Sequence, residues 1–263
     1  MTHPRNPAEP SLGAETTHPW VEPTEAPRRE GARYPEPRPT SGVRRACDIV
    51  GSLALLVGLA PVFVLVALAV RLSSPGPVIY RQTRVGLNRR SGVDRREDGR
   101  GAHGVDRRRL DRRTIASAGC LFRILKFRTM VEDAETTGGP RWAQKNDARV
   151  TPLGRLLRHT RLDELPQLVN VLRGDMSFIG PRPERPFFVE RLRRAIPGYM
   201  ERLTVAPGIT GLAQVEHTYD TNVEDVRLKL EYDLRYVRDR GLAADLRILA
   251  KTVRVVVTGH GAH

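Results

Sequence analysis

The segment Ile49–Val70 constrains the fold more than any other part of the chain. Its 22 residues, IVGSLALLVGLAPVFVLVALAV, carry no charge. As one helix they would be ~33 Å long at ~1.5 Å per residue, enough to cross the hydrocarbon core of a bilayer. Pro61 lies near the middle, where a proline removes a backbone hydrogen bond and kinks a helix. The sequence therefore predicts a broken membrane helix.

Two membrane topologies fit this segment. A kinked span would put its two ends on opposite sides, whereas a re-entrant helix-break-helix would return the chain to the side that it entered. Arg44 and Arg45 precede the segment and Arg71 follows it. The positive-inside bias then applies to both flanks, which favours a re-entrant helix over 43–71 with its break at Pro61. A buried helix of a soluble core is the remaining alternative.

Two other segments have compositions that do not support a core. The first 42 residues contain nine prolines and few aliphatic residues, so we predict a disordered tail over 1–42. This tail has no apolar stretch behind a basic start and is not a secretory signal. Residues 88–118 contain ten arginines and few aliphatic residues, which predicts a flexible insertion that anionic lipid could attract. Residues 258–263 form a short tail.

The formal net charge of +14 predicts an anionic partner: nucleic acid, lipid headgroups or a phosphorylated substrate. Arginine supplies almost all of it, because the chain has only four lysines. The two cysteines, Cys47 and Cys120, give no framework for disulfides or a metal site. We expect both to be small buried hydrophobic residues.

The rest of the chain reads as mainly α with a small β element, an α+β fold in a compact domain over 72–257. Residues 78–87 are β-prone, and 120–125 read as their strand partner or as the entry to a helix. Helical periodicity is plain in 164–173, 187–195, 223–240 and 243–257. The last of these is amphipathic and basic, able to lie on a membrane surface or to pack on a core. Its apolar face comprises Leu246, Leu249, Val253, Val256 and Val257.

Two adjacent carboxylates, Asp163 and Glu164, open the helical run that continues through Pro166. Because proline is tolerated in the first turn of a helix, Asp163 is placed at the N-cap and Glu164 at the first helical position. Both residue types are favoured there for structural reasons alone. The functional interpretation is that helix N–H groups keep Asp163 ionised and nucleophilic at a site that also attracts phosphate.

Basic residues near this pair favour the functional interpretation, because guanidinium groups bind phosphate oxygens bidentately. Glu164 together with Asp147 or Asp175 could hold Mg²⁺, which takes one or two carboxylates plus substrate phosphates. The chain has no P-loop, GxGxxG, HExxH, CxxC pair or nucleophile elbow. The candidate phosphate-binding residues are Lys126, Arg128, Arg149, Arg158 and Arg182, the last fixed between Pro181 and Pro183.

At these residues the chain resembles the bacterial sugar transferases, the monotopic polyprenyl-phosphate phosphoglycosyl transferases. The matching elements follow the broken apolar helix in order: SPGPVIYRQTRVG, FRILKFRTM, NDARVTPLGRLLR, LDELPQLVNVLRGDMSFIGPRPE, PGITGLAQV and YDLRYVRD…DLRILAKTV. They cover about 43–87 and 119–257. The stretch from RPFFVERLRRAIPGY to VEDVRLKLEYDL resembles members associated with exopolysaccharide synthesis.

The resemblance implies that Asp163 attacks the sugar-linked phosphate of a UDP-sugar and releases UMP. A polyprenyl phosphate then accepts the sugar phosphate from the aspartyl intermediate. Glu164 would bind Mg²⁺, and Lys126, Arg158 and Arg182 would position phosphates and carboxylates. We add Gln167 and Asn170 to the substrate-binding set.

We therefore predict an enzyme of the bacterial inner membrane, with re-entrant and interfacial helices and a cytoplasmic catalytic domain. Its partners would be a UDP-sugar, polyprenyl phosphate and membrane lipid; the donor sugar, the polymer and the oligomeric state, a homo-oligomer included, stay open. One alternative is a basic membrane-tethered protein that binds nucleic acid, a partner we do not expect because no recognition motif supports it. The other is an inactive scaffold of the same fold.

Overall fold

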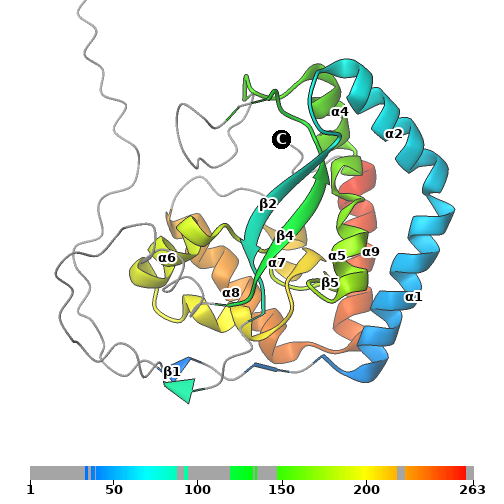
Figure 1. The fold of residues 1–263 in the computed structure, drawn as a ribbon. Helices are drawn as coiled ribbons and strands as arrows, with labels where there is room; N and C mark the ends of the chain where they lie inside the picture. Colours follow the sequence, from blue (N-terminus) through cyan, green and yellow to red (C-terminus); the bar gives the residue numbers. More distant parts are fainter. Residues whose placement is uncertain are drawn as a thin grey trace, which may run out of the picture.

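The computed structural model describes residues 40–87, 119–132, 147–217 and 223–258, with the short pieces 33–34, 37–38, 92–93 and 134. The predicted 1–42 tail and 88–118 insertion lie mostly outside these residues, as do 259–263. The described part is mostly helical with small sheets, as predicted (Figure 1). The helices are α1 (Gly42–Gly58), α2 (Ala60–Ser73), α4 (Pro152–His159), α5 (Gln167–Arg173), α6 (Pro186–Ala195), α7 (Leu212–Glu216), α8 (Val223–Asp239) and α9 (Leu242–Thr258), with the 3₁₀ helices η1 (Leu162–Glu164) and η2 (Tyr199–Thr204).

The strands of the described residues form three two-stranded sheets. In the longest, β2 (Ile79–Val85) pairs antiparallel with β4 (Leu121–Phe127), from Ile79 opposite Phe127 to Val85 opposite Leu121. The strand interpretation of 120–125 is thereby confirmed. The short sheets are β5 (Ser177–Ile179) with β6 (Gly208–Thr210), which are parallel, and β1 (Arg33–Tyr34) with β3 (Gly92–Val93), which are antiparallel.

Helices α1 and α2 form a bent arm along one edge of the molecule (Figure 1). No single helix of the described residues is long and apolar enough to cross a membrane, but this pair, bent by 64°, passes that test together. The bend lies at Leu59, and Pro61 occupies the first turn of α2. A proline ring clashes with the carbonyl four residues earlier, here that of Val57, so α1 ends just before it.

Large apolar side chains cover the outward face of the arm. Val50, Val57, Val64 and Leu65 are each 66–68% exposed. The apolar stripe of α9 also faces outward, since Leu246 is 67% exposed and Val253 64%, while Ile248 on the opposite face is buried. The described core therefore does not pack against the apolar face of α9 that helical periodicity predicted.

Polar contacts dock α1 on the rest of the chain. Arg45 donates from Nη1 and Nη2 to the carbonyl oxygens of Val171 and Leu172 at the end of α5, both at 2.6 Å. Buried Asp48 accepts from Ser177 Oγ at 3.0 Å and from the Phe178 amide at 3.1 Å. Arg44 pairs with Asp245 of α9 at 2.6 Å. Each contact fixes α1 without using its apolar face.

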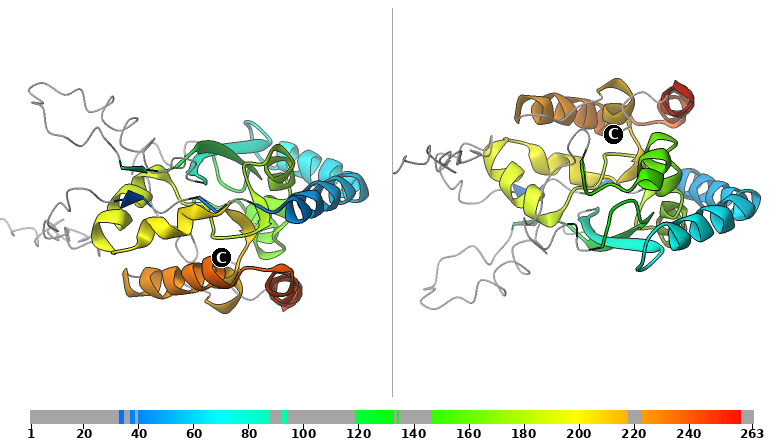
Figure 2. Two further views of the ribbon diagram at one scale, coloured as in Figure 1. Left: turned by 90° about the horizontal axis from the view of Figure 1, so that it is seen from below. Right: turned by 90° about the horizontal axis from the view of Figure 1, so that it is seen from above.

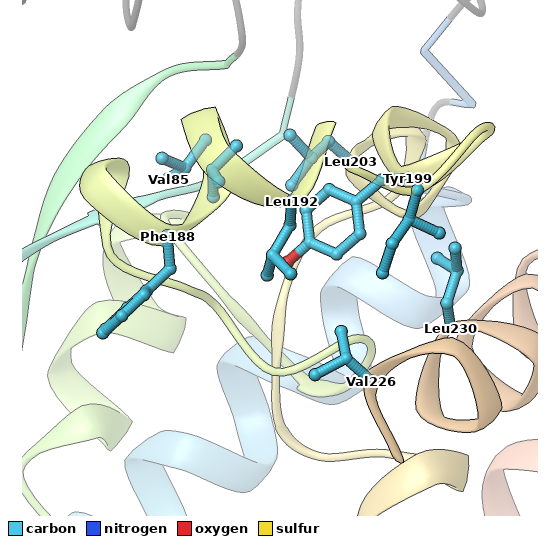
Figure 3. Packing of buried hydrophobic residues seen from close by; sticks show 9 residues of the cluster. Val85, Phe188, Leu192, Tyr199, Leu203, Val226 and Leu230 are labelled. Atoms are coloured by element: carbon cyan, nitrogen blue, oxygen red, sulfur yellow. The ribbon is translucent and has the colours of Figure 1, made fainter. Parts of the chain in front are cut away.

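The interior is built around a cluster that joins α6, η2 and α8 to the end of β2 (Figure 3). Its buried members are Val85, Phe188, Val189, Leu192, Ile196, Tyr199, Leu203, Val226 and Leu230. Helices α8 and α9 form a layer on one side of the molecule, opposite β2 and α2 (Figure 2). The prediction of buried cysteines is wrong: Cys47 and Cys120 are exposed, because one lies on the outer side of α1 and the other precedes β4.

Candidate active site

The carboxylate pair lies in a 3₁₀ turn and not at a helix N-cap. Arg161 takes a left-handed conformation (φ 58°), η1 follows, and α5 begins only at Gln167. Pro166 occupies the cap position of α5 and no side chain caps that helix. The predicted N-cap role of Asp163 is therefore wrong, because the proline moved the start of the regular helix past the pair. Asp163 is 5% exposed and Glu164 7%.

Glu164 lies between two cations. Its Oε1 accepts from Lys126 Nζ of β4 at 2.8 Å and from Arg182 Nη2 at 2.7 Å, while Arg182 Nη1 is 3.4 Å from Oε2. Burial alone would raise the pKa of Glu164, but the charges of Arg182 and Lys126 outweigh it and hold the pKa well below its usual value. Glu164 is thus ionised and its Oε2 is the less engaged oxygen.

Asp163 has a looser environment. Its Oδ2 lies 3.8 Å from Lys126 Nζ, the one ion pair within 4 Å that Asp163 makes with the described residues. Burial raises the pKa of Asp163, and the charge of Lys126 only partly opposes this effect. The two neighbours therefore differ: Glu164 is neutralised by its partners, whereas the charge of Asp163 is poorly solvated and only partly compensated. The charges of Lys126, Arg182 and Arg158 favour the ionised form of Asp163, but burial and the charge of Glu164 outweigh them and raise its pKa.

Arg158 extends the cationic side of the site. It lies in the last turn of α4 and donates from Nε to Thr129 Oγ1 at 3.0 Å. Burial lowers the pKa of Arg158, and the charges of Asp163 and Asp147 oppose this effect. Arg149 pairs with Asp147 at 2.5 Å, and this hydrogen bond lowers the pKa of Asp147. The guanidinium of Arg149 is thus engaged by Asp147.

Two other predicted site residues have structural partners. Arg128 is buried and does not reach the pair: it donates to the carbonyl oxygens of Val70, Ser74 and Pro75, at the end of α2. Asn170 is fully buried and joins α5 to β4, accepting from the Leu125 amide at 3.0 Å and donating to the Arg123 carbonyl at 2.8 Å.

Gln167 is fully buried one turn after the pair, and neither its amide nitrogen nor its amide oxygen has a hydrogen-bond partner among the described residues. Its predicted contact with a substrate stays a prediction.

The residues of the site could hold Mg²⁺ only together with a substrate, because they supply few oxygen ligands by themselves. Among the described residues no group of three or more His, Cys, Asp or Glu could hold a metal ion. Of the predicted co-ligands, Asp147 is paired with Arg149 and Asp175 accepts from Asn170 at 3.2 Å. What is left is the adjacent pair Asp163 and Glu164, the latter with its Oε2 weakly engaged. One or two carboxylates are enough for Mg²⁺ when a phosphate substrate and water supply the other oxygens.

Sequence reasoning missed Arg202 of η2, which donates to the carbonyl oxygen of Arg182 at 2.8 Å. In a chain with 44 lysines and arginines no local pattern separates this one from the exposed ones. Taken together, the site offers one carboxylate with a raised pKa next to a neutralised one, and at least three cations, Lys126, Arg158 and Arg182. That arrangement suits nucleophilic chemistry on an anionic phosphate group.

Comparison with known proteins gives a consistent result. A family model described as "Bacterial sugar transferase" matches residues 40–91 and 110–259. The segment that it leaves out falls inside the predicted insertion.

Several curated proteins are similar over most of the chain. The UDP-N-acetylgalactosamine-undecaprenyl-phosphate N-acetylgalactosaminephosphotransferase of Aeromonas hydrophila is 39% identical over 220 residues, which are 84% of this chain and 45% of that protein. A UDP-glucose:undecaprenyl-phosphate glucose-1-phosphate transferase of Caulobacter vibrioides is 38% identical, with 87% and 75% covered. The exopolysaccharide production protein PSS of Rhizobium leguminosarum is 35% identical, with 80% and 93% covered. The chain thus spans less than half of the Aeromonas protein and nearly all of the Rhizobium one.

Proposed function

The chain belongs to the bacterial sugar transferase family, and we propose that it transfers a sugar 1-phosphate from a UDP-sugar to a polyprenyl phosphate. The observation that carries this proposal is the cluster of two buried carboxylates, Asp163 and Glu164, with two partly exposed cations, Lys126 and Arg182. Relatives named for transfer to undecaprenyl phosphate support the acceptor.

In the proposed first step, a carboxylate oxygen of Asp163 attacks the phosphorus that bears the sugar. A new P–O bond forms to Asp163, the P–O bond to the uridine monophosphate part breaks, and UMP leaves with the electron pair of that bond. In the second step an oxygen of the polyprenyl phosphate attacks the same phosphorus and releases Asp163. The product is a sugar joined to the lipid by a diphosphate.

Each neighbour of Asp163 has a role in this scheme. Lys126 and Arg158 screen the repulsion between a carboxylate and a negatively charged phosphate, a condition for attack at either step. Arg182 binds the phosphate oxygens on the side of Glu164. A bound Mg²⁺, held by Glu164 and the substrate phosphates, would stabilise the charge on the leaving UMP.

The bent arm supports a membrane location. We propose that α1 and α2 enter the bilayer from the cytoplasmic face of the bacterial inner membrane and return to it, and that α9 lies in the interface. The exposed apolar side chains of the arm and of α9, with arginine at both ends of the arm, agree with this placement. The similarity to the Rhizobium protein favours a role in exopolysaccharide synthesis.

Activity is tested by UMP release in membranes that contain the full chain, Mg²⁺ and undecaprenyl phosphate. The donor panel should include UDP-glucose and UDP-N-acetylgalactosamine, the sugars named in its relatives. No release from any donor by folded protein would contradict the proposal and favour an inactive scaffold. With an active donor and no acceptor, Asp163 should gain the mass of one phosphosugar, and Asp163→Asn should not.

Topology is tested by cysteine labelling. In a variant carrying Cys47→Ser and Cys120→Ser, single cysteines at Ala46 and Leu72 mark the two ends of the arm. Labelling of both from the cytoplasmic side supports the re-entrant arrangement. Labelling from opposite sides shows a kinked span.

A further inference from the structure

The turn that carries Arg182 is held by three consecutive main-chain carbonyls, each with a donor from another element. This is a dense set of bonds for a loop without regular structure. The bonds are Arg202 Nη2 to Arg182 O at 2.8 Å, Arg84 Nη1 to Pro183 O at 3.0 Å, and the Val85 amide to Glu184 O at 2.9 Å.

The first of these bonds controls where the Arg182 side chain points. Pro183 restricts Arg182 to an extended backbone conformation, so the direction of the Arg182 carbonyl is tied to the direction of its side chain. When Arg202 fixes that carbonyl, it also fixes the bond from Cα to Cβ of Arg182. The guanidinium at the far end then meets Glu164 with Nη2 at 2.7 Å from Oε1. A misplacement of about 1 Å at such a group costs on the order of a hundredfold in rate.

Arg202 is itself fixed by a buried acid. Its Nε and Nη2 lie 2.9 and 2.7 Å from Oδ2 of Asp233 on α8, and both side chains are 2% exposed. Its Nη1 donates to the hydroxyl of Tyr199 at 3.0 Å, within the apolar cluster of Figure 3. The guanidinium therefore has a bond on each nitrogen and a single orientation.

Neither net stability nor ligand binding accounts well for this arrangement. A buried ion pair often stabilises a fold no better than apolar side chains of the same volume. The cavity beside Arg202 and Asp233 has a volume of about 10 Å³, which is room for a single water at most. Among the described residues, the hydrogen bond by which Arg202 reaches toward the active site is its bond to the Arg182 carbonyl.

We infer that the buried pair Arg202 and Asp233 is a positioning device for the transfer reaction, holding the Arg182 carbonyl so that the Arg182 guanidinium stays on Glu164. This inference rests on the proposed function, because it assigns both residues to the same active site. Neither residue touches the substrate. Their effect passes through Arg182.

A double-mutant cycle on the full chain tests this assignment. Asp233→Asn keeps the size of the side chain and removes the charge that orients Arg202; we expect about a tenfold loss of kcat/KM. Arg182→Lys keeps the positive charge but loses the guanidinium, whose two nitrogens contact both carboxylate oxygens of Glu164. If Asp233 acts through Arg182, the double variant should have a kcat/KM less than threefold below that of Arg182→Lys alone. Losses that simply multiply would overturn the inference.

Hydrogen exchange gives a readout that does not depend on activity. In Asp233→Asn, peptides covering 177–188 should exchange at least fivefold faster, and peptides from α9 should keep wild-type rates. Equal acceleration everywhere, or none at 177–188, contradicts the inference. The matched control is Glu190→Gln, which removes a carboxylate that pairs with Arg193 on α6. If wild-type protein releases no UMP, the proposed function fails, and the exchange rates still decide whether Asp233 fixes the turn.

Discussion

The amide variants Glu164→Gln and Asp163→Asn are nearly isosteric with the wild type, so each removes one negative charge and leaves the packing intact. We expect opposite changes in the free energy of unfolding at neutral pH. Glu164→Gln should destabilise the fold, because Lys126 and Arg182 lose their shared carboxylate. Asp163→Asn should stabilise it, because burial of the Asp163 charge is only partly compensated.

The magnitudes follow from the contacts. Breaking a buried ion pair by removing one partner costs about 3–5 kcal/mol, and a charged hydrogen bond contributes about 1.5–3 kcal/mol. The side chains of Lys126 and Arg182 are 19% and 28% exposed, so water recovers part of this loss. We expect Glu164→Gln to cost about 2–3 kcal/mol, or roughly 5–10 °C in Tm for a chain of this size. Asp163→Asn should add about 1 kcal/mol, as when a strained active-site group is removed.

The pH dependence separates the two effects further. The lowered pKa of Glu164 means that its contribution is present above the ordinary value of 4.5 and is lost as the pH falls through the lowered value. The raised pKa of Asp163 has the opposite effect on the free energy of unfolding. The cost of its charge is absent below the ordinary value of 3.8 and appears as the pH rises through the raised value. The advantage of Asp163→Asn should therefore be greatest at neutral pH and vanish in acid.

The assay is thermal unfolding of the detergent-solubilised full chain, followed by circular dichroism at several pH values. Glu224→Gln serves as the control, because its ion pair with Arg227 is exposed and exposed ion pairs contribute at most about 1 kcal/mol. If Asp163→Asn lowers Tm at neutral pH while Glu164→Gln leaves it unchanged, then Asp163 is the compensated carboxylate and Glu164 the uncompensated one, and the reasoning fails.

Three further predictions concern residues around the site. Arg128→Met should lower stability by about 2–4 kcal/mol, since it leaves buried carbonyls at the end of α2 without a donor, and kcat of the remaining folded enzyme should stay near wild type. Gly154→Ala should destabilise by about 3 kcal/mol or more in chemical unfolding, because its Cβ would lie 2.1 Å from the Thr129 carbonyl oxygen. Arg45→Met should cost about 1–3 kcal/mol and speed hydrogen exchange at the end of α5, while α8 keeps its rates.

Much of the fold is predictable because its signals are local. An uncharged run with one central proline is enough to predict a bent helix pair, and β-prone runs on both sides of an arginine-rich insertion predict the hairpin of β2 and β4. Helices α6, α8 and α9 begin and end within a residue or so of their periodic patterns. The apolar stripe of α9 shows the limit, since periodicity finds an amphipathic helix but does not say which face the core takes.

The site depends more on tertiary structure. Asp163, Glu164, Lys126 and Arg182 meet as the motifs suggest, but the conformation of the pair was mispredicted, because the effect of Pro166 depends on the left-handed turn at Arg161. Arg128 lies two residues from Lys126 and looks equally suited to phosphate. Only the position of α2 shows that the guanidinium of Arg128 already donates to carbonyl oxygens at the end of that helix.

The contact between Arg45 and the end of α5 fixes the distance between the arm and the carboxylate pair. The six residue steps along α5 span about 9 Å at 1.5 Å per residue, and the carboxylate pair lies just beyond its other end. An arm seated in a bilayer would thus set the height of the Asp163 carboxylate above the lipid. A lipid-borne phosphate reaches only as far as its headgroup depth allows. Lengthening or shortening α5 by one turn would then change which acceptors can react, without altering a single atom at the site.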